Sequence, residues 1–416
     1  MGKKMLLWVL LLGVVIMGGV IWGEKETPVP DKEKKPSDKE TVIAGNNEFA
    51  LELYAKLREN KGNLFFSPYS ISTALAMTYG GARENTAKQM AEVMRFTLEQ
   101  KKLHPAFAEL IKDLNAEKKG YQLSVANALW GQEGYNFLAD FIELTKNNYG
   151  AGLNEVDFAN ATEDARQTIN AWVEKQTQDK IKELLKPGII NELTRLVLTN
   201  AIYFKGNWAV QFKKEKTKDA LFTLPDGKKI DVPMMNQTGN FKYGEGEGLK
   251  ILEMPYVDGE LSMVILLPEK DDGITDLEES LNTKNLKQWL QGIVKQEVIV
   301  ALPKFKTTSE FLLNKVLESM GMTDAFSGKE ADFSGLNGTK HDLYITAVVH
   351  KAFVDVNEEG TEAAAATAVI IGTKSARQTT TFRADHPFIF FIRDTRSGGI
   401  LFMGRVEKPG GETKEK

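Results

Sequence analysis

In the first half of the chain, apolar and polar positions recur mostly at helical spacing. Residues 47–59 place apolar side chains four positions apart, which predicts an amphipathic helix with one buried stripe. A second helix is expected to begin at Ser67 and Pro68, because serine is a favoured N-cap and proline is favoured at the first helical position. Residues 169–173 repeat the helical spacing, so helices are expected to concentrate early in the chain.

Strand patterns are intermingled with these helices and dominate later in the chain. Alternating apolar residues over 121–130 predict a half-buried strand, and the apolar run 196–204 predicts a strand buried on both faces. Turn sequences at 225–227 and 258–259 separate further strand-like runs and predict hairpins. Helices packed on mostly antiparallel sheets give an α+β fold class.

The N-terminus has a separate pattern. Lys3 and Lys4 precede an uncharged run of 18 residues, 5–22. As a helix this run would be about 27 Å long, close to the hydrocarbon core of a bilayer. Residues 1–23 are therefore predicted to be either a membrane anchor or a signal peptide, although Met17 and Ile21 stand where cleavage would need small residues. A buried core helix is the weaker alternative.

Either export hypothesis predicts an extracellular location for the remainder, which would be secreted or attached to the membrane through residues 5–22. Residues 24–40 are charged and interrupted by proline, so they are predicted to form a disordered linker. No second linker follows, and residues 41–416 are expected to form one domain.

Composition narrows the classes of function. The net charge is −4 with 26% charged residues, so no basic excess favours nucleic acid. Cysteine is absent, which excludes disulfides and thiolate sites, and the histidines lack zinc-enzyme spacing: His104, His341, His350 and His386. We therefore predict no metal and no cofactor. The Glu/Lys richness would suit a thermophilic prokaryote.

One connection is unusually long for its position between two strands. About 25 residues separate the strand ending near 356 from the one starting at Phe382, and connections of this length are usually functional or disordered. Residues 361–371 are small or β-branched and carry one charge, Glu362, so nothing in them prevents entry into a sheet as a strand. The simpler interpretation is a surface loop containing a short alanine helix.

The run 358–368, EEGTEAAAATA, resembles the hinge of inhibitory serpins. Further blocks resemble serpin sequence in serpin order across residues 46–409: 63–90, 123–130, 198–208, 232–235, 302–305, 331–335, 348–367 and 382–392. The resemblance implies a serpin fold, with a large central mostly antiparallel sheet, further sheets, about eight or nine helices, and an exposed reactive-centre loop over about 358–381.

The family mechanism implies an inhibitor rather than an enzyme. A serine protease would cut the loop, remain attached as an acyl-enzyme, and be carried along as the loop inserts into the central sheet. Family spacing places the cut at Lys374–Ser375, with Arg377–Gln378 as the alternative, and lysine implies a trypsin-like target. A subtilisin-like protease is the second candidate, and these two cations could simply keep the loop soluble.

Three groups of residues carry over from the family. The hinge comprises Glu358, Glu359, Gly360, Thr361, Glu362, Ala363, Ala364, Ala365, Ala366 and Thr367. Thr361 and every second residue after it share one face, which is expected to turn toward the core on insertion. The sheet-opening cluster comprises Ser67, Ser70, Asn200 and His350, and the breach comprises Trp208, Lys304 and Glu358. Plain core packing is the alternative for Trp208, and an exposed Lys304–Glu358 pair would contribute only ~0–1 kcal/mol.

The resemblance also implies a monomer whose partner is the protease. Nucleic acid is not expected as a partner, because the charge balance leaves no basic excess. A non-inhibitory serpin, acting as a chaperone or ligand carrier, would share the fold and is the alternative function. A serine hydrolase is disfavoured because no GxSxG motif occurs.

Overall fold

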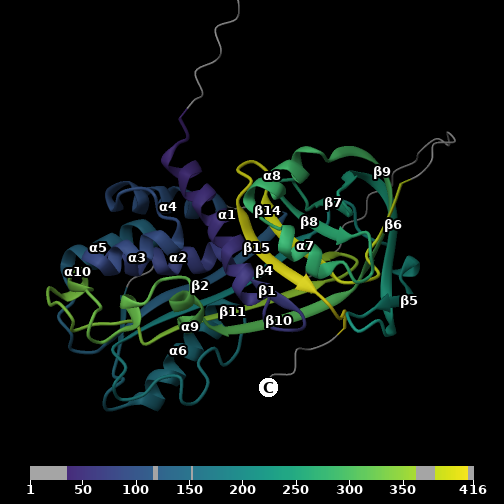
Figure 1. Cartoon of the computed structure of the whole chain (residues 1–416). Coiled ribbons are helices and arrows are strands. Elements are labelled where there is room, and N and C mark those ends of the chain that lie inside the picture. The colour runs from purple at the N-terminus through teal and green to yellow at the C-terminus, as the bar shows by residue number, and fades with distance from the viewer. Residues whose placement is uncertain (1–34, 116–119, 151–152, 362–379, 411–416) are drawn as a thin grey trace, which may run out of the picture. The chain divides into compact units, whose positions relative to one another are not determined.

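The computed structural model describes residues 35–115, 120–150, 153–361 and 380–410 of the 416-residue chain. Two compact units are distinguished, Met1–Pro36 and Ser37–Lys416, and the fold below is that of the second. Its described residues form two sheets and ten α-helices, compared with the eight or nine expected (Figure 1). The predicted α+β class is confirmed.

The helices are unevenly distributed along the chain, with six of the ten before residue 180. Their bounds are α1 Asp38–Leu57, α2 Pro68–Tyr79, α3 Glu84–Met94, α4 Gln100–Asn115, α5 Ala139–Tyr149, α6 Thr162–Gln176, α7 Ile274–Ser280, α8 Thr283–Gln291, α9 Asn314–Ser319 and α10 Ser334–Asn337. Short 3₁₀ turns form at η1 Lys214–Lys216 and η2 Asp324–Phe326.

Helix α1 begins inside the range predicted as linker. The expected boundary at residue 41 is wrong because Ser37 and Glu40 form a capping box: the Ser37 side chain accepts from the Glu40 amide, and the Glu40 side chain accepts from the Ser37 amide. Reciprocal capping of this kind satisfies two backbone donors that a helix start otherwise leaves unpaired. The helix therefore starts at Asp38, nine residues before the predicted helical range at 47.

Helix α2 begins where the sequence predicted. The Ser67 side chain caps it by accepting from the Ser70 amide, and Pro68 is its first residue. All twelve residues of α2 are buried, and the helix contacts strands of both sheets. It therefore lies in the centre of the core and brings its N-terminal serines against the smaller sheet.

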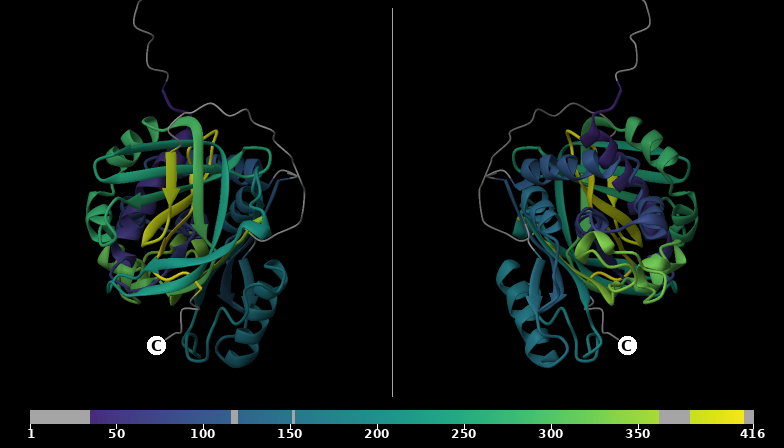
Figure 2. Two further views of the ribbon diagram at one scale, coloured as in Figure 1. Left: turned by 90° about the vertical axis from the view of Figure 1, so that its right-hand side faces the viewer. Right: turned by 90° about the vertical axis from the view of Figure 1, so that its left-hand side faces the viewer.

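The six-stranded sheet has the order β10-β11-β12-β4-β2-β3. Its strands are β2 Tyr121–Gln132, β3 Leu153–Val156, β4 Leu196–Asn207, β10 Phe305–Leu312, β11 Ala347–Val356 and β12 Gly360–Thr361. Most neighbours are antiparallel, but β4 and β11 are parallel over seven register pairs, from Ala347↔Val197 to Phe353↔Tyr203. Helices α2 and α6 cover opposite faces of this sheet (Figures 1 and 2).

The nine-stranded sheet has the order β1-β15-β14-β8-β7-β6-β9-β13, with β5 paired to β6. Its strands are β1 Leu64–Phe66, β5 Lys218–Thr223, β6 Lys229–Gly246, β7 Leu249–Pro255, β8 Leu261–Pro268, β9 Val294–Pro303, β13 Thr380–Arg383, β14 Phe388–Asp394 and β15 Ile400–Val406. The two predicted hairpin turns join β5 to β6 and β7 to β8.

The predicted signal peptide or anchor, 1–23, lies outside the described residues. Within the part of the chain that the structure describes, no helix combines the length and apolar character needed to cross a bilayer.

Candidate functional site

The start of the hinge already lies inside the six-stranded sheet. After β11 ends, Asn357 forms a turn in which its side-chain oxygen accepts from the amides of Glu359 and Gly360 at 3.0 and 3.3 Å. The Asn357 amide donates to the Gly360 carbonyl at 2.8 Å. The turn reverses the chain, so that β12 runs antiparallel to both β11 and β4 and lies between them.

Glycine is required at position 360 because two backbones approach closely there. Gly360 pairs with Asn207, and a Cβ atom added to Gly360 would lie 2.1 Å from the carbonyl oxygen of Gly206. A backbone atom cannot move aside as the end of a side chain can. Any larger residue would therefore push the hinge out from between the two strands.

Thr361 points into the core, the face on which the sequence placed it. Its side chain is fully buried, and its Oγ1 lies 2.9 Å from the hydroxyl of Tyr256. Burial raises the pKa of Tyr256 well above its ordinary value, so the phenol stays protonated and can donate. Tyr256 in turn stacks on Trp208 with ring centroids 4.8 Å apart.

The breach residues surround this entry point. Trp208 donates from Nε1 to the Asn357 carbonyl and from its backbone amide to the Glu359 carbonyl, both at 3.0 Å. Phe212 donates its amide to the Glu358 carbonyl at 2.8 Å. The segment before β12 is therefore held along its backbone, which is a more specific arrangement than plain core packing of the tryptophan.

The Lys304–Glu358 pair is more buried than the exposed pair considered from the sequence. Glu358 is 4% exposed, and its carboxylate accepts from Lys304 Nζ and from Thr217 Oγ1, both at 2.8 Å. Burial alone would raise the pKa of Glu358, but these hydrogen bonds hold it below its ordinary value. The neighbouring Glu359 is paired with the exposed Lys214 at 2.5 Å.

The sheet-opening cluster is assembled in the middle of the seam between β4 and β11. Asn200 on β4 and His350 on β11 are direct register partners and are hydrogen-bonded through Asn200 Oδ1 and His350 Nδ1. Ser67 donates its amide to His350 Nε2 at 3.1 Å, and Ser70 Oγ accepts from Asn200 Nδ2 at 2.6 Å. All four side chains are fully buried.

These contacts fix the protonation of His350. Because Nε2 accepts from an amide, Nδ1 must carry the proton that is donated to Asn200. Burial lowers the pKa of His350 to about 3, so the ring is neutral at physiological pH.

The structure adds Asn127 to the cluster, a residue that the sequence reasoning missed. Its side-chain oxygen accepts from Ser70 Oγ at 2.9 Å and from Asn200 Nδ2, and its amide donates to the Ser70 carbonyl at 3.1 Å. Asn127 pairs with Asn200 in register, so a polar row crosses β2, β4 and β11. A signal was present, because Asn127 is the polar residue at an inward position of an otherwise apolar alternation.

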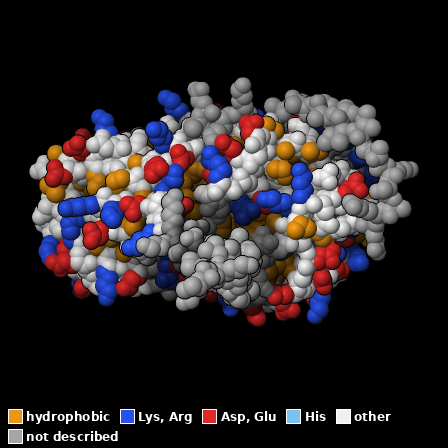
Figure 3. All heavy atoms as spheres, turned by 90° about the horizontal axis from the view of Figure 1, so that it is seen from above, with side chains coloured by type: hydrophobic (Ala, Val, Ile, Leu, Met, Phe, Trp, Pro, Cys, Tyr) orange, Lys and Arg blue, Asp and Glu red, His pale blue; other side chains and the backbone are white. Residues whose placement is uncertain are grey.

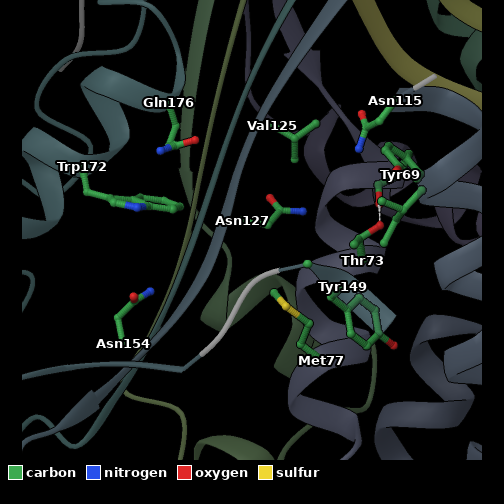
Figure 4. A pocket seen from close by; sticks show the side chains of 12 residues that line it. Tyr69, Thr73, Met77, Asn115, Val125, Asn127, Tyr149, Asn154, Trp172 and Gln176 are labelled. Atoms are coloured by element: carbon green, nitrogen blue, oxygen red, sulfur yellow. Dashed lines mark hydrogen bonds between the residues drawn. The ribbon is translucent and has the colours of Figure 1, made fainter. Parts of the chain in front are cut away.

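Asn127 also lines a cavity of about 510 Å³ beside β2 (Figure 4). The lining residues come from four helices and two strands: Tyr69, Thr73, Met77, Ile111, Asn115, Val125, Asn127, Tyr149, Gly150, Asn154, Trp172 and Gln176. The polar row therefore has one end in this cavity and the other end on β11.

The remaining predicted site residues are not placed. The reactive bond Lys374–Ser375, its alternative Arg377–Gln378, and hinge residues 362–367 lie outside the described residues. Among the described residues, no group of three or more His, Asp or Glu side chains could hold a metal ion.

We expect unfolding to become easier below about pH 6.5 because of His350. A free imidazole has a pKa of ~6.5, so at lower pH the unfolded chain binds a proton that the folded ring, with a pKa of about 3, does not bind. The free energy of unfolding should therefore fall by up to ~1.4 kcal/mol per pH unit between about pH 6.5 and pH 3, and stay unaffected by this group above that range.

Two measurements check this prediction. Histidine ¹⁵N NMR should show a neutral His350 ring at pH 5, and a titration midpoint near 6.5 would contradict it. In His350→Gln the fall in melting temperature from pH 6.5 to 5 should be smaller, although not abolished. His104 remains in that variant, and burial lowers its pKa to about 4.

Comparison with known proteins places this geometry in a family. The family model described as Serpin (serine protease inhibitor) matches residues 44–409. Leukocyte elastase inhibitor of Homo sapiens is 46% identical over 381 residues, which cover 89% of this chain and 100% of the relative. Serpin B6 of Pongo abelii is 44% identical over 377 residues, with the same coverage.

Solved structures with a similar fold support the same family assignment. Uncleaved ovalbumin has a TM-score of 0.82 at 33% identity and covers 89% of this chain and 100% of its own. Serpin48 of Tenebrio molitor has a TM-score of 0.80 at 36% identity, with 88% and 98% covered. The family description and the elastase inhibitor's name are those of inhibitors, in agreement with the expectation that the chain is not an enzyme.

Two expectations are corrected by these relatives. The prokaryotic source is contradicted, because the matched curated proteins come from animals such as Homo sapiens and Xenopus tropicalis. The extracellular location is also contradicted: those elastase inhibitors are matched over 100% of their length by 89% of this chain, and the family model begins only at residue 44. They therefore offer no counterpart of the N-terminal run on which location and membrane attachment rested.

A hinge that enters the sheet between two parallel strands, a polar cluster across the seam below it, and a family match over residues 44–409 lead to one conclusion: the chain belongs to the serpin family.

Proposed function

We propose that this chain is a suicide-substrate inhibitor of serine proteases that traps its target by inserting the cut loop between β4 and β11. The observation that carries the proposal is β12, because Thr361 already pairs with both β11 and β4, the neighbours of the strand that insertion would create, and Gly360 pairs with β4. Insertion would then extend an existing strand and would not need to begin a new one.

Cleavage would follow ordinary acyl transfer. The protease serine attacks the carbonyl of the bait residue, the peptide bond breaks, and the new amino group departs with the following residue. The bait residue remains joined to the protease by an ester. If the loop inserts before water reaches that ester, the protease is carried with it and hydrolysis stops.

The register of β12 supports a defined path for the inserted strand. Thr361 lies opposite both Gly206 and Val356. Six residues further along the chain, an antiparallel strand in the same register would bring Thr367 opposite both Asn200 and His350, which are already partners of each other. The two strands would therefore separate sideways without sliding.

This register gives Thr367 a role. It shares the inward face with Thr361 by the period-two rule, so its hydroxyl would arrive at the sheet-opening cluster. Insertion must break the hydrogen bond between His350 and Asn200. We propose that the Thr367 hydroxyl replaces it, because an unpaired buried imidazole or amide would cost about 1–3 kcal/mol.

The fold alone does not separate an inhibitor from a carrier. A structure of thyroxine-binding globulin, complexed with its hormone, matches with a TM-score of 0.82 at 31% identity. The hinge favours the inhibitor, because 363–366 are all alanine and carry no bulky or charged side chain that would resist burial. A chaperone or carrier function is therefore the disfavoured alternative.

Target recognition is proposed to depend on the bait more than on surface charge. On the face seen in Figure 3, acidic and basic side chains are interspersed and are not gathered by sign. The leukocyte elastase inhibitor among the relatives is named for elastase, whose specificity pocket is small, whereas a lysine at 374 would fit the acidic pocket of a trypsin-like enzyme. We therefore propose a trypsin-like target, with a subtilisin-like protease as the second candidate.

Lys374→Ala should slow inhibition of trypsin by about 100-fold or more, because the acidic pocket would lose its partner. Melting temperature should stay unchanged, and Arg377→Ala, the matched control, should inhibit normally. Edman sequencing of the complex should give Ser375 as the new N-terminus. A new N-terminus at Gln378 would transfer the role to Arg377.

Cleavage in the loop should raise the melting temperature sharply. About a dozen new ladder hydrogen bonds, at ~1 kcal/mol net each, would add on the order of 10 kcal/mol, comparable to the stability of a whole domain. Calorimetry of the uncut and cut protein measures this. Equal melting temperatures would rule out insertion.

Thr361→Arg should convert the inhibitor into a substrate. The site is fully buried and in contact with Tyr256, so a long charged side chain would be excluded from it. Each ~1.4 kcal/mol added to the insertion barrier slows insertion tenfold. Hydrolysis of the acyl-enzyme would then be faster than insertion. The variant should be cut at the same bond but form little denaturant-resistant complex with trypsin.

Glu362→Arg is the matched control for that variant. Its side chain would point to the opposite face by the period-two rule, so trapping should be largely retained. Efficient trapping by both arginine variants would show that the hinge assignment is wrong.

A further inference from the structure

The C-terminal end of the reactive-centre loop is attached through β13, the last strand in the order of the nine-stranded sheet. This strand has four residues. Among the described strands it pairs only with β9, in parallel register from Thr380↔Val298 to Arg383↔Ala301. Parallel pairs are slightly less stable per residue than antiparallel pairs. A short strand with one partner is a weak attachment, so the contacts just beyond β13 matter for keeping it in place.

Three residues after β13, the ring of His386 lies among hydrogen-bond acceptors. The residue is buried, with 5% of its surface exposed. Its Nε2 is 2.8 Å from the Pro268 carbonyl oxygen, and its Nδ1 is 3.0 Å from Asp385 Oδ1 and 3.7 Å from Asp271 Oδ1. A carbonyl and a carboxylate can only accept, so both ring nitrogens must donate. The geometry therefore requires a doubly protonated, positively charged ring.

Asp385 joins this ring to β13. One of its carboxylate oxygens is bonded to His386, and the other accepts from Nε of Arg383, the last residue of β13, at 2.8 Å. The Asp385 carbonyl accepts from the Thr223 amide at the end of β5, also at 2.8 Å. Three segments therefore meet at the ring: the end of β13, the end of β5 and the connection between β8 and α7.

Two carboxylates face the ring from different segments. Asp385 is its neighbour in the chain, and Asp271 comes from the connection between β8 and α7. Strand β5 contributes the uncharged Thr223, whose hydroxyl donates to Asp271 at 3.3 Å. Burial by itself would lower the pKa of His386, but the contacts with Asp385, Pro268 and Asp271 raise it above its ordinary value. The charged ring therefore persists to a higher pH than in a free histidine.

We propose that His386, Asp385 and Asp271 form a pH-sensitive clamp, which keeps β13 on the sheet and weakens when the ring loses a proton. A neutral ring donates from one nitrogen only, so its other nitrogen would direct a lone pair at an acceptor. The stabilising effect of the clamp is complete below about pH 6.5, where a free histidine is also protonated. It is lost as the pH rises through the raised pKa of the folded ring.

Release of β13 would leave the loop attached at β12 alone. An uncut loop with a free C-terminal end would be able to enter the sheet between β4 and β11 without a protease, and the molecule would then no longer present its bait. Because each such event requires β13 to open first, the loss of active inhibitor should follow the opening of β13. This consequence rests on the proposed inhibitory function, whereas the clamp itself does not.

The clamp is tested on the uncut full-length chain without protease. Histidine ¹⁵N NMR should show both nitrogens of His386 protonated at pH 6, with a titration midpoint above 6.5. Hydrogen-exchange protection factors correct for the direct effect of pH on exchange. For the amides of β13 they should fall by about threefold or more between pH 6.5 and pH 8.5, while those of β7, inside the same sheet, stay constant.

Asp271→Asn is the informative variant, because this side chain is mostly exposed and asparagine keeps its shape. Loss of the facing charge should lower the titration midpoint of His386 and move the fall in β13 protection to lower pH. Asp272→Asn is the matched control, because it removes the same charge one residue further along and outside the two ion pairs of the ring. A midpoint at or below 6.5, β13 protection that does not change with pH, or equal behaviour of the two variants would overturn the clamp.

The consequence is tested by storing the protein at pH 6.5 and at pH 8.5 and then titrating all samples against trypsin at one common pH. The parent and Asp272→Asn should lose activity about threefold faster at pH 8.5, with the chain still uncut by mass spectrometry. At pH 7.5, Asp271→Asn should lose activity faster than the parent. Equal rates at both pH values would overturn the consequence. A chain that never inhibits trypsin would contradict the proposed function instead, and the NMR and exchange results would still decide the clamp.

Discussion

The seven register pairs between β4 and β11 form the seam that defines the observed state of the molecule. His350↔Asn200 is the middle pair, so the buried hydrogen bond of the sheet-opening cluster lies equally far from both ends of the seam. Above the seam, β12 occupies the space between the same two strands. The parallel seam is therefore the contact that an inserted antiparallel strand would replace.

The N-terminus of α2 connects this seam to the rest of the core. The Ser67 hydroxyl caps the helix and donates to the Leu401 carbonyl on β15, while its amide donates to His350. Ser67 alone therefore makes hydrogen bonds to the start of α2, to the larger sheet and to the seam of the smaller sheet. Because α2 is buried along its whole length, the two sheets cannot move far relative to each other without disturbing these bonds.

The sequence predicted the fold class, the cap of α2, both hairpins and the inward face of Thr361, because each depends on local spacing or on a family block. The capping box at Ser37 was missed because proline and lysine dominate the composition around it. The burial of Glu358 could not be foreseen, since it depends on Thr217 and Lys304 from distant segments. To predict that Asn127 belongs to the sheet-opening cluster, one would have to know that β2 and β4 pair in a register that aligns two asparagines.

The two-sided pairing of Thr361 has a kinetic consequence. A strand that grows inward from β12 gains backbone partners on both flanks with each residue, so every further residue makes withdrawal slower. Insertion of the loop would therefore be faster than its withdrawal from the first step onward. The movement would be directional because its first residue is already paired on both sides before any bond is cut.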